Sequence, residues 1–177
     1  MDNMISLKIT QDGKERDITV PANEAAFENV TSMQITDCAC PMLKGMDIDS
    51  EDIPALNDFA VQLRQISAAD KLPKLNAVLS ANQCSNINQA VLLACRLKHF
   101  NLDARIKNYA DLVYDELENV IGGRQAEEIR ECLDIEKYGR ILQQGYNSVF
   151  TEYGMVTRDD FQPMGTPWEA NSDEPWW

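Results

Sequence analysis

Short runs of alternating apolar and polar residues open the chain and predict strands. Residues 4–10 alternate in this way, which is typical of a strand with one buried face. Turn-forming residues follow at 11–14, and a second apolar-polar run occupies 16–20. Two such runs around a short Asp-Gly turn predict a β-hairpin.

The next 30 residues are expected to complete a small α+β unit. We expect a short helix over 21–30, with its larger apolar residues facing inward, and a third strand over 32–36. Residues 47–52 form an acidic connector. These elements predict an N-terminal α+β domain over residues 1–52.

After the connector, apolar residues recur at the three-and-four spacing of amphipathic helices. Three short helices are expected, forming a helical middle domain over residues 53–107. Their start signals are Pro54, a Ser67–Asp70 capping box, and Ser85 or Asn86.

The last third of the sequence predicts further helices followed by strands. Asn108 is expected to cap a helix that Gly122 and Gly123 end, and Asp134 is expected to cap a later one. Residues 147–156 change to a strand-like pattern with a turn at Gly154. This gives an acidic C-terminal domain over 108–160, mostly helical with a short β-hairpin.

Residues 161–177 show no periodicity and contain all three Trp beside several acids, so we expect a Trp-rich tail. The fold class predicted for the whole chain is therefore α+β. It consists of an α+β module, two mostly helical domains and this tail.

Charge is distributed unevenly over the 177 residues, whose net charge is −13. Residues 1–52 carry 11 acids and 4 bases, 53–107 carry 3 acids and 7 bases, and 108–177 carry 15 acids and 5 bases. Such acidity disfavours direct nucleic-acid binding, because phosphates would be repelled. The partner is expected to be basic.

Other features of the composition predict a cytoplasmic protein that does not enter a membrane. An apolar content of 44% is normal for a folded protein. No run approaches the roughly 18–20 apolar residues of a membrane span, and the first residues lack a signal-peptide pattern. An odd number of cysteines, five, adds to the expectation of a reducing cytoplasm.

The residues that usually carry catalysis are scarce. His99 is the only histidine, and at a predicted helix end it is expected to be a surface cation. Cys38 and Cys40 form a Cys-x-Cys pair, which is not the usual redox or zinc spacing. Cys95 and Cys132 occupy apolar helical positions and are expected in the core. We predict no enzyme, metal or cofactor. A metal-dependent enzyme or regulator that uses Cys38, Cys40 and His99 stays an alternative.

The strongest candidate surface is the acidic stretch between residues 111 and 136. Its nine acids face only Arg124 and Arg130, for a net charge of −7. Helical spacing of three and four places sets of them on one face, where like charges repel one another. Over that length a helix could imitate one strip of DNA phosphates. The nine acids are Asp111, Asp115, Glu116, Glu118, Glu127, Glu128, Glu131, Asp134 and Glu136.

Three segments resemble motifs of the ArdA-type antirestriction proteins, a family of DNA mimics carried by conjugative and mobile elements. Residues 55–63 (ALNDFAVQL) resemble its LNxLAxxL motif. Residues 132–140 (CLDIEKYGR) and 150–156 (FTEYGMV) are similar to the family's motifs nearer the end of the chain. The likeness extends over roughly residues 4–158.

The resemblance implies an elongated row of three small domains that forms a homodimer and has no enzymatic activity. Such proteins occupy the DNA groove of Type I restriction–modification enzymes and so protect incoming mobile DNA. It implies that the nine acids above are the mimic surface and that Tyr138, Ile141 and Phe150 make core or dimer contacts. A second acidic group extends that surface: Asp47, Asp49, Glu51 and Asp52.

A different class of function stays open beside this one. The chain could be a non-catalytic adaptor, or an inhibitor of another defence or DNA-binding complex. It would then bind through apolar surfaces and the Trp-rich tail. The positive net charge of residues 53–107 departs from the resemblance, because the middle domain of the family is usually acidic.

Overall fold

The computed structural model describes residues 5–167, and its first two strands form the predicted hairpin. β1 (Ile5–Gln11) pairs antiparallel with β2 (Lys14–Val20) through a turn at Asp12 and Gly13. Both turn residues have positive φ, 51° and 72°, as a tight hairpin turn requires. β3 (Val30–Asp37) pairs with the other edge of β1, giving the order β2-β1-β3.

The helix expected over residues 21–30 is reduced to one short turn. Only the 3₁₀ turn η1 (Glu24–Phe27) forms there, and Val30 already belongs to β3. Asn23 caps this turn by accepting a hydrogen bond from the Ala25 backbone N–H at 3.0 Å. Two further 3₁₀ turns, η2 (Pro41–Leu43) and η3 (Ser50–Asp52), lead to the first helix.

Three helices follow, as the apolar spacing predicts: α1 (Ile53–Ala68), α2 (Leu72–Ala81) and α3 (Ile87–Cys95). Asn86 caps α3, and its side-chain oxygen accepts from the Gln89 backbone N–H at 2.8 Å. The Ser67–Asp70 capping box is wrong, because Lys71 precedes α2 without a side-chain cap and Asp70 has a φ of 55°.

A second sheet joins segments that lie far apart in the sequence. β4 (Phe100–Asp103), which follows the short turn η4 (Leu97–His99), pairs antiparallel with β6 (Gly154–Arg158). β5 (Val149–Thr151) pairs with the other edge of β6 and gives the order β4-β6-β5. The hairpin around Gly154 is confirmed, whereas β4 is too short for its pattern to predict a strand.

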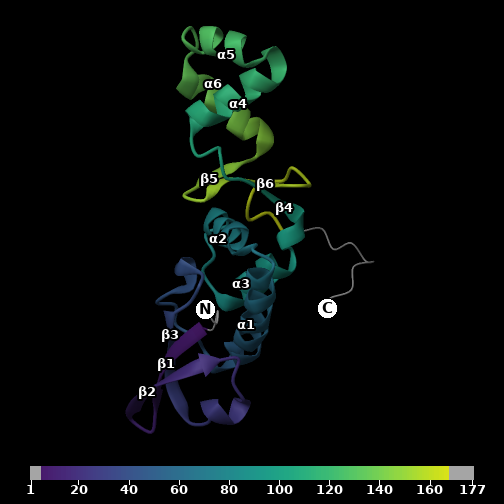
Figure 1. Cartoon of the computed structure of the whole chain (residues 1–177). Coiled ribbons are helices and arrows are strands. Elements are labelled where there is room, and N and C mark those ends of the chain that lie inside the picture. The colour runs from purple at the N-terminus through teal and green to yellow at the C-terminus, as the bar shows by residue number, and fades with distance from the viewer. Residues whose placement is uncertain (1–4, 168–177) are drawn as a thin grey trace.

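The remaining helices are α4 (Tyr109–Ile121), α5 (Gly123–Arg130) and α6 (Ile135–Tyr146). Asn108 and Asp134 cap α4 and α6 as predicted, and Gly122, with a φ of 85°, separates α4 from α5. These helices share a small core of their own. In Figure 1 they lie at one end of the molecule, beyond the β4–β6 sheet.

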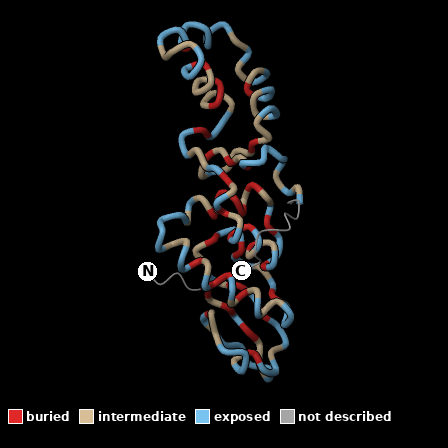
Figure 2. The backbone as a smooth tube through the Cα atoms, turned by 90° about the vertical axis from the view of Figure 1, so that its right-hand side faces the viewer, coloured by how far each residue is buried: buried red, intermediate tan, exposed pale blue. Residues whose placement is uncertain are grey.

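The expected elongated row of three domains is wrong. Within the described residues, the chain is one α+β fold with six α-helices and two three-stranded antiparallel sheets. Its main core runs without a break from Ile5 of β1 through α1–α3 to Phe100 of β4 and Val156 of β6. Figure 2 shows these buried segments crossing from the first sheet to the second.

The strands and helices of the main core meet because each has an apolar face to bury. β1 contributes Ile5, Leu7 and Ile9, all nearly inaccessible to solvent, and α1 contributes Leu56 and Phe59. Burial of such faces against one another is the dominant favourable term in folding.

All three Trp of the expected tail lie outside the described residues. Within residues 5–167, no helix combines the length and apolar character that crossing a membrane requires.

Candidate acidic binding surface

Three of the acids on α4 hold this helix to its neighbours. The Asp111 carboxylate accepts from the Lys107 backbone N–H at 2.9 Å, and Asp115 pairs with Arg105 at 3.3 Å. Glu116 accepts from the Tyr146 hydroxyl of α6 at 2.7 Å. All three carboxylates are only partly exposed, so their acceptor capacity is largely used within the fold.

Hydrogen bonds made by the partners of these acids shift the pKa values of groups near α4. The hydrogen bond to Glu116, aided by burial, raises the pKa of Tyr146, which therefore stays protonated and donating. Arg105 also binds Asp103, and its guanidinium hydrogen bond lowers the pKa of that carboxyl. The sequence pattern did not reveal Arg105 or Tyr146 as partners of α4, because each lies 10 or more positions from the α4 acid that it binds.

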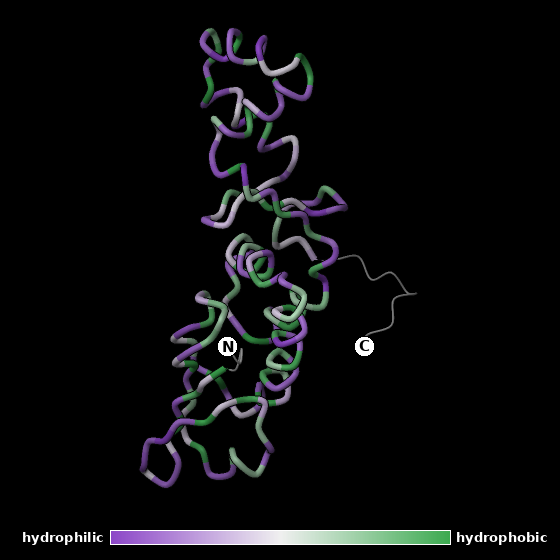
Figure 3. Tube along the Cα trace, viewed as in Figure 1, coloured by the Kyte–Doolittle hydropathy of each residue, from purple (hydrophilic) through white to green (hydrophobic). Residues whose placement is uncertain are grey.

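By contrast, the acids on α5, between α5 and α6, and in the first turn of α6 belong to exposed residues. We call this set the α5 acidic surface: Glu127, Glu128, Glu131, Asp134 and Glu136. Together with Glu118 near the end of α4, they are the exposed members of the nine acids. Figure 3 shows hydrophilic segments at this end of the molecule.

The bases near the α5 acidic surface neutralise it only in part. Arg124 lies 3.9 Å from Glu128 and Arg140 lies 2.7 Å from Glu136, both as exposed pairs one helical turn apart. Exposed pairs of this kind contribute little, typically below about 1 kcal/mol. Arg130 stacks over the Tyr114 ring, 5.9 Å from its centroid, which directs this guanidinium towards α4.

The second acidic group, residues 47–52, lies at a different part of the fold. It follows β3 and precedes α1, and Figure 1 places this segment far from α4–α6. Asp47 accepts from Gln34 at 3.0 Å and Asp52 accepts from Asn88 at 2.6 Å. The structure therefore does not join these carboxylates to the α5 acidic surface.

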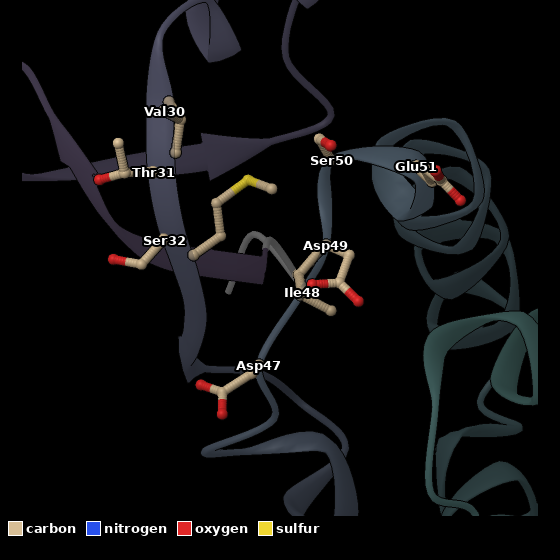
Figure 4. A pocket seen from close by; sticks show the side chains of 9 residues that line it. Val30, Thr31, Ser32, Asp47, Ile48, Asp49, Ser50 and Glu51 are labelled. Carbon is tan, nitrogen blue, oxygen red and sulfur yellow. The ribbon is translucent and has the colours of Figure 1, made fainter.

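Three members of this second group line a hollow of about 500 Å³ beside β3. Figure 4 shows that the side chains of Asp47, Asp49 and Glu51 point in different directions and do not converge on one point. Among residues 5–167, no group of three or more His, Cys, Asp or Glu side chains is arranged to hold a metal ion.

The residues expected at core or dimer contacts have different environments. Tyr138 packs partly buried against the small core of α4–α6. Phe150 contacts Tyr109 edge to face, with ring centroids 5.4 Å apart. Ile141, on α6, has 57% of its surface exposed, so it lies largely outside the core.

The residues of the metal-dependent alternative are not brought together as a metal site. The His99 ring nitrogen Nδ1 lies 2.8 Å from an Asp159 oxygen, whereas Cys38 and Cys40 follow β3. Cys95 and Cys132 are exposed, so the prediction that they pack in the core is wrong.

Comparison of the chain with protein-family models, with curated proteins and with solved structures found no match to any of them.

Proposed function

We propose that this chain is an ArdA-type antirestriction protein. It would act in the cytoplasm and inhibit Type I restriction–modification enzymes, presenting carboxylates where these enzymes bind DNA phosphates. Incoming mobile DNA would thereby be protected. The observation that carries the proposal is the α5 acidic surface, whose five carboxylates all belong to exposed residues.

The spacing of the acids on and just after α5 defines the extent of the mimicry that we propose. Its eight residues extend about 12 Å at 1.5 Å per residue. One strand of B-DNA carries about four phosphates over that length. Glu127, Glu128 and Glu131 present three carboxylates over about 6 Å of helical rise, with Arg124 and Arg130 on the same helix. The mimicry proposed is therefore of one strip of phosphates and not of a whole duplex.

The basic segment of the chain does not interrupt this strip. Residues 53–107 form α1–α3 and β4, whereas the acids lie on α4–α6 at the end of the molecule. We extend the proposal to a homodimer, which would repeat the acidic strip. The exposed Ile141 is the candidate dimer contact.

The test is a restriction assay with a purified Type I enzyme, the full-length chain and competing duplex DNA. Changing Glu127, Glu128 and Glu131 to Gln removes three exposed charges without touching the Asp134 cap. At about 0.2–1 kcal/mol for each of the three exposed contacts, inhibition should weaken by roughly 3- to 150-fold. The matched control, which removes three exposed N-terminal charges, is Asp17→Asn, Glu24→Gln and Glu28→Gln.

The control variant should inhibit like the wild-type chain. Inhibition should also weaken steeply as salt rises, because exposed charges are screened over about 8 Å at physiological ionic strength. A wild-type chain that leaves the enzyme fully active would refute the proposal. So would a triple variant on α5 that inhibits as well as the control.

The adaptor remains a second candidate, and exposed apolar residues favour it. Val120, near the end of α4, has 70% of its surface exposed, and Ile129 and Ile141 are also exposed. Apolar contacts are insensitive to moderate salt, so an adaptor should keep its partner when ionic strength rises. Replacing Val120 by Ser should weaken binding by an adaptor and leave charge-based inhibition unchanged.

A further inference from the structure

Three of the five cysteines lie in or beside the junction between β3 and α2. Cys38 and Cys40 follow β3 directly, and the carbonyl of Ala39 between them accepts from Asn76 of α2 at 3.2 Å. Cys84 lies three residues after α2 ends. Cys40 is fully buried and Cys38 is partly exposed, so a small molecule can reach only the latter.

The geometry directs hydrogen-bond donors at the Cys38 sulfur. The backbone N–H of Cys40 lies 3.3 Å from it, and the Cys40 thiol hydrogen-bonds to the same sulfur. Residues two apart in an extended chain carry their side chains on the same side. The chain bends at residues 39 and 40, and the side-chain hydrogen bond between Cys38 and Cys40 keeps the two thiols close together.

Cys84 is engaged elsewhere, because its thiol donates to the Asn86 carbonyl at 3.4 Å. The two remaining cysteines are exposed and interact with other groups. Cys95 accepts from Gln62 at 3.2 Å, and the Cys132 thiol lies 3.9 Å from the Glu128 carbonyl. In the described part of the chain, no interaction links either of them to a second cysteine.

The titration behaviour of the pair agrees with its geometry. The hydrogen bond from the Cys40 thiol lowers the pKa of Cys38, against an opposing effect of burial. The same hydrogen bond and burial raise the pKa of Cys40. Thiolates and not thiols attack electrophiles, so Cys38 is the more nucleophilic sulfur of the two.

We propose that Cys38 and Cys40 form a redox-active dithiol that a hydroperoxide oxidises to an intrachain disulfide. The Cys38 thiolate attacks one peroxide oxygen, the O–O bond breaks, the other oxygen leaves as hydroxide and takes up a proton, and Cys38 becomes a sulfenic acid. The Cys40 thiol then gives its proton to the departing hydroxide as its sulfur attacks Cys38, so the S–O bond breaks and water leaves. With hydrogen peroxide, two thiols are oxidised and one peroxide is reduced to two molecules of water.

The test treats the reduced full-length chain with stoichiometric hydrogen peroxide near neutral pH. Two of the five thiols should be lost, with a decrease of about 2 Da in intact mass. The tryptic peptide 17–44 contains Cys38 and Cys40 as its only cysteines, and the decrease should lie in this peptide. In Cys40→Ala the sulfenic acid at Cys38 should persist and be trapped by dimedone.

The control variant carries Cys95→Ser and Cys132→Ser and should still form the disulfide. Oxidation of Cys95 or Cys132 before Cys38 in the wild-type chain would overturn the proposal. A cross-link from Cys40 to Cys84 would also overturn it, since it joins peptide 17–44 to another peptide. The wild-type measurement needs no substitution, so it stands even where a variant fails to fold.

Discussion

The contact between α4 and α6 depends on the absence of a side chain at Gly139. A Cβ at this position would lie 2.6 Å from the Cβ of Tyr109, at the start of α4. Carbon atoms pack at about 3.5–4.0 Å, so α6 would have to move by roughly 1 Å. Tyr109 cannot yield easily, because its ring contacts Phe150 and its hydroxyl donates to Gln143 at 3.1 Å.

Two opposing effects determine the outcome of Gly139→Ala. Alanine favours a helix over glycine by about 1 kcal/mol. Overpacking a well-packed contact costs about 1–3 kcal/mol. The clash meets a Cβ, which moves only with its backbone, so we take the upper part of that range. The expected result is a net destabilisation of about 1–2 kcal/mol.

Gly145→Ala is the matched control, because Gly145 lies on the same helix and a Cβ added there would meet nothing within 4 Å. This change should stabilise the chain by about 0.5 kcal/mol, since propensity alone acts near a helix end. Urea unfolding of both variants measures the difference, with the slope m compared to detect any change in unfolding mechanism. If Gly139→Ala proves as stabilising as Gly145→Ala, the close packing of α4 on α6 is refuted.

Three further predictions concern single interactions. Arg158 is only 2% exposed and donates to Asp160 and to the Thr166 carbonyl, so Arg158→Leu should cost about 2–3 kcal/mol in denaturant unfolding. Arg105→Leu, at an exposed pair, should change stability by less than about 1 kcal/mol. Arg158 also lowers the pKa of Asp160 in the folded chain. The pair therefore contributes to the free energy of unfolding above the unfolded carboxyl pKa of about 3.9, and this contribution is lost as pH falls through the lower pKa of the folded state. The free energy of unfolding should therefore fall less steeply with decreasing pH in Arg158→Leu than in the wild-type chain. An equally steep fall in both would contradict this. Asn108→Ala removes the α4 cap and should cost about 1 kcal/mol by the same unfolding assay, with Asn108→Asp nearly neutral.

Structural features that depend on only a few neighbouring residues could be predicted from the sequence. Asn86, Asn108 and Asp134 cap helices as expected, because a cap needs only its own side chain and the next three backbone amides. The Ser67–Asp70 pair has the three-residue spacing of a capping box but does not cap α2. Asp70 takes a positive φ where the chain turns between α1 and α2.

The sequence predicts where the acids of the candidate surface lie along the chain. It does not predict which of their carboxylates are exposed. All nine acids lie on or beside the expected helices. Asp115 and Glu116 nevertheless bind Arg105 and Tyr146, which the sequence places 10 and 30 positions away. No local pattern indicates such a pair, so exposure had to come from the fold.

The sequence by itself determined the α+β class, the first hairpin, most helix starts and the concentration of acid in the last third. These follow from side-chain period and short-range hydrogen bonds. Only the tertiary structure decided that β4 pairs with β6 and that one core joins Ile5 to Val156. It also decided which carboxylates face solvent. Each of these depends on contacts between distant segments, whose energies are absent from any short stretch of sequence.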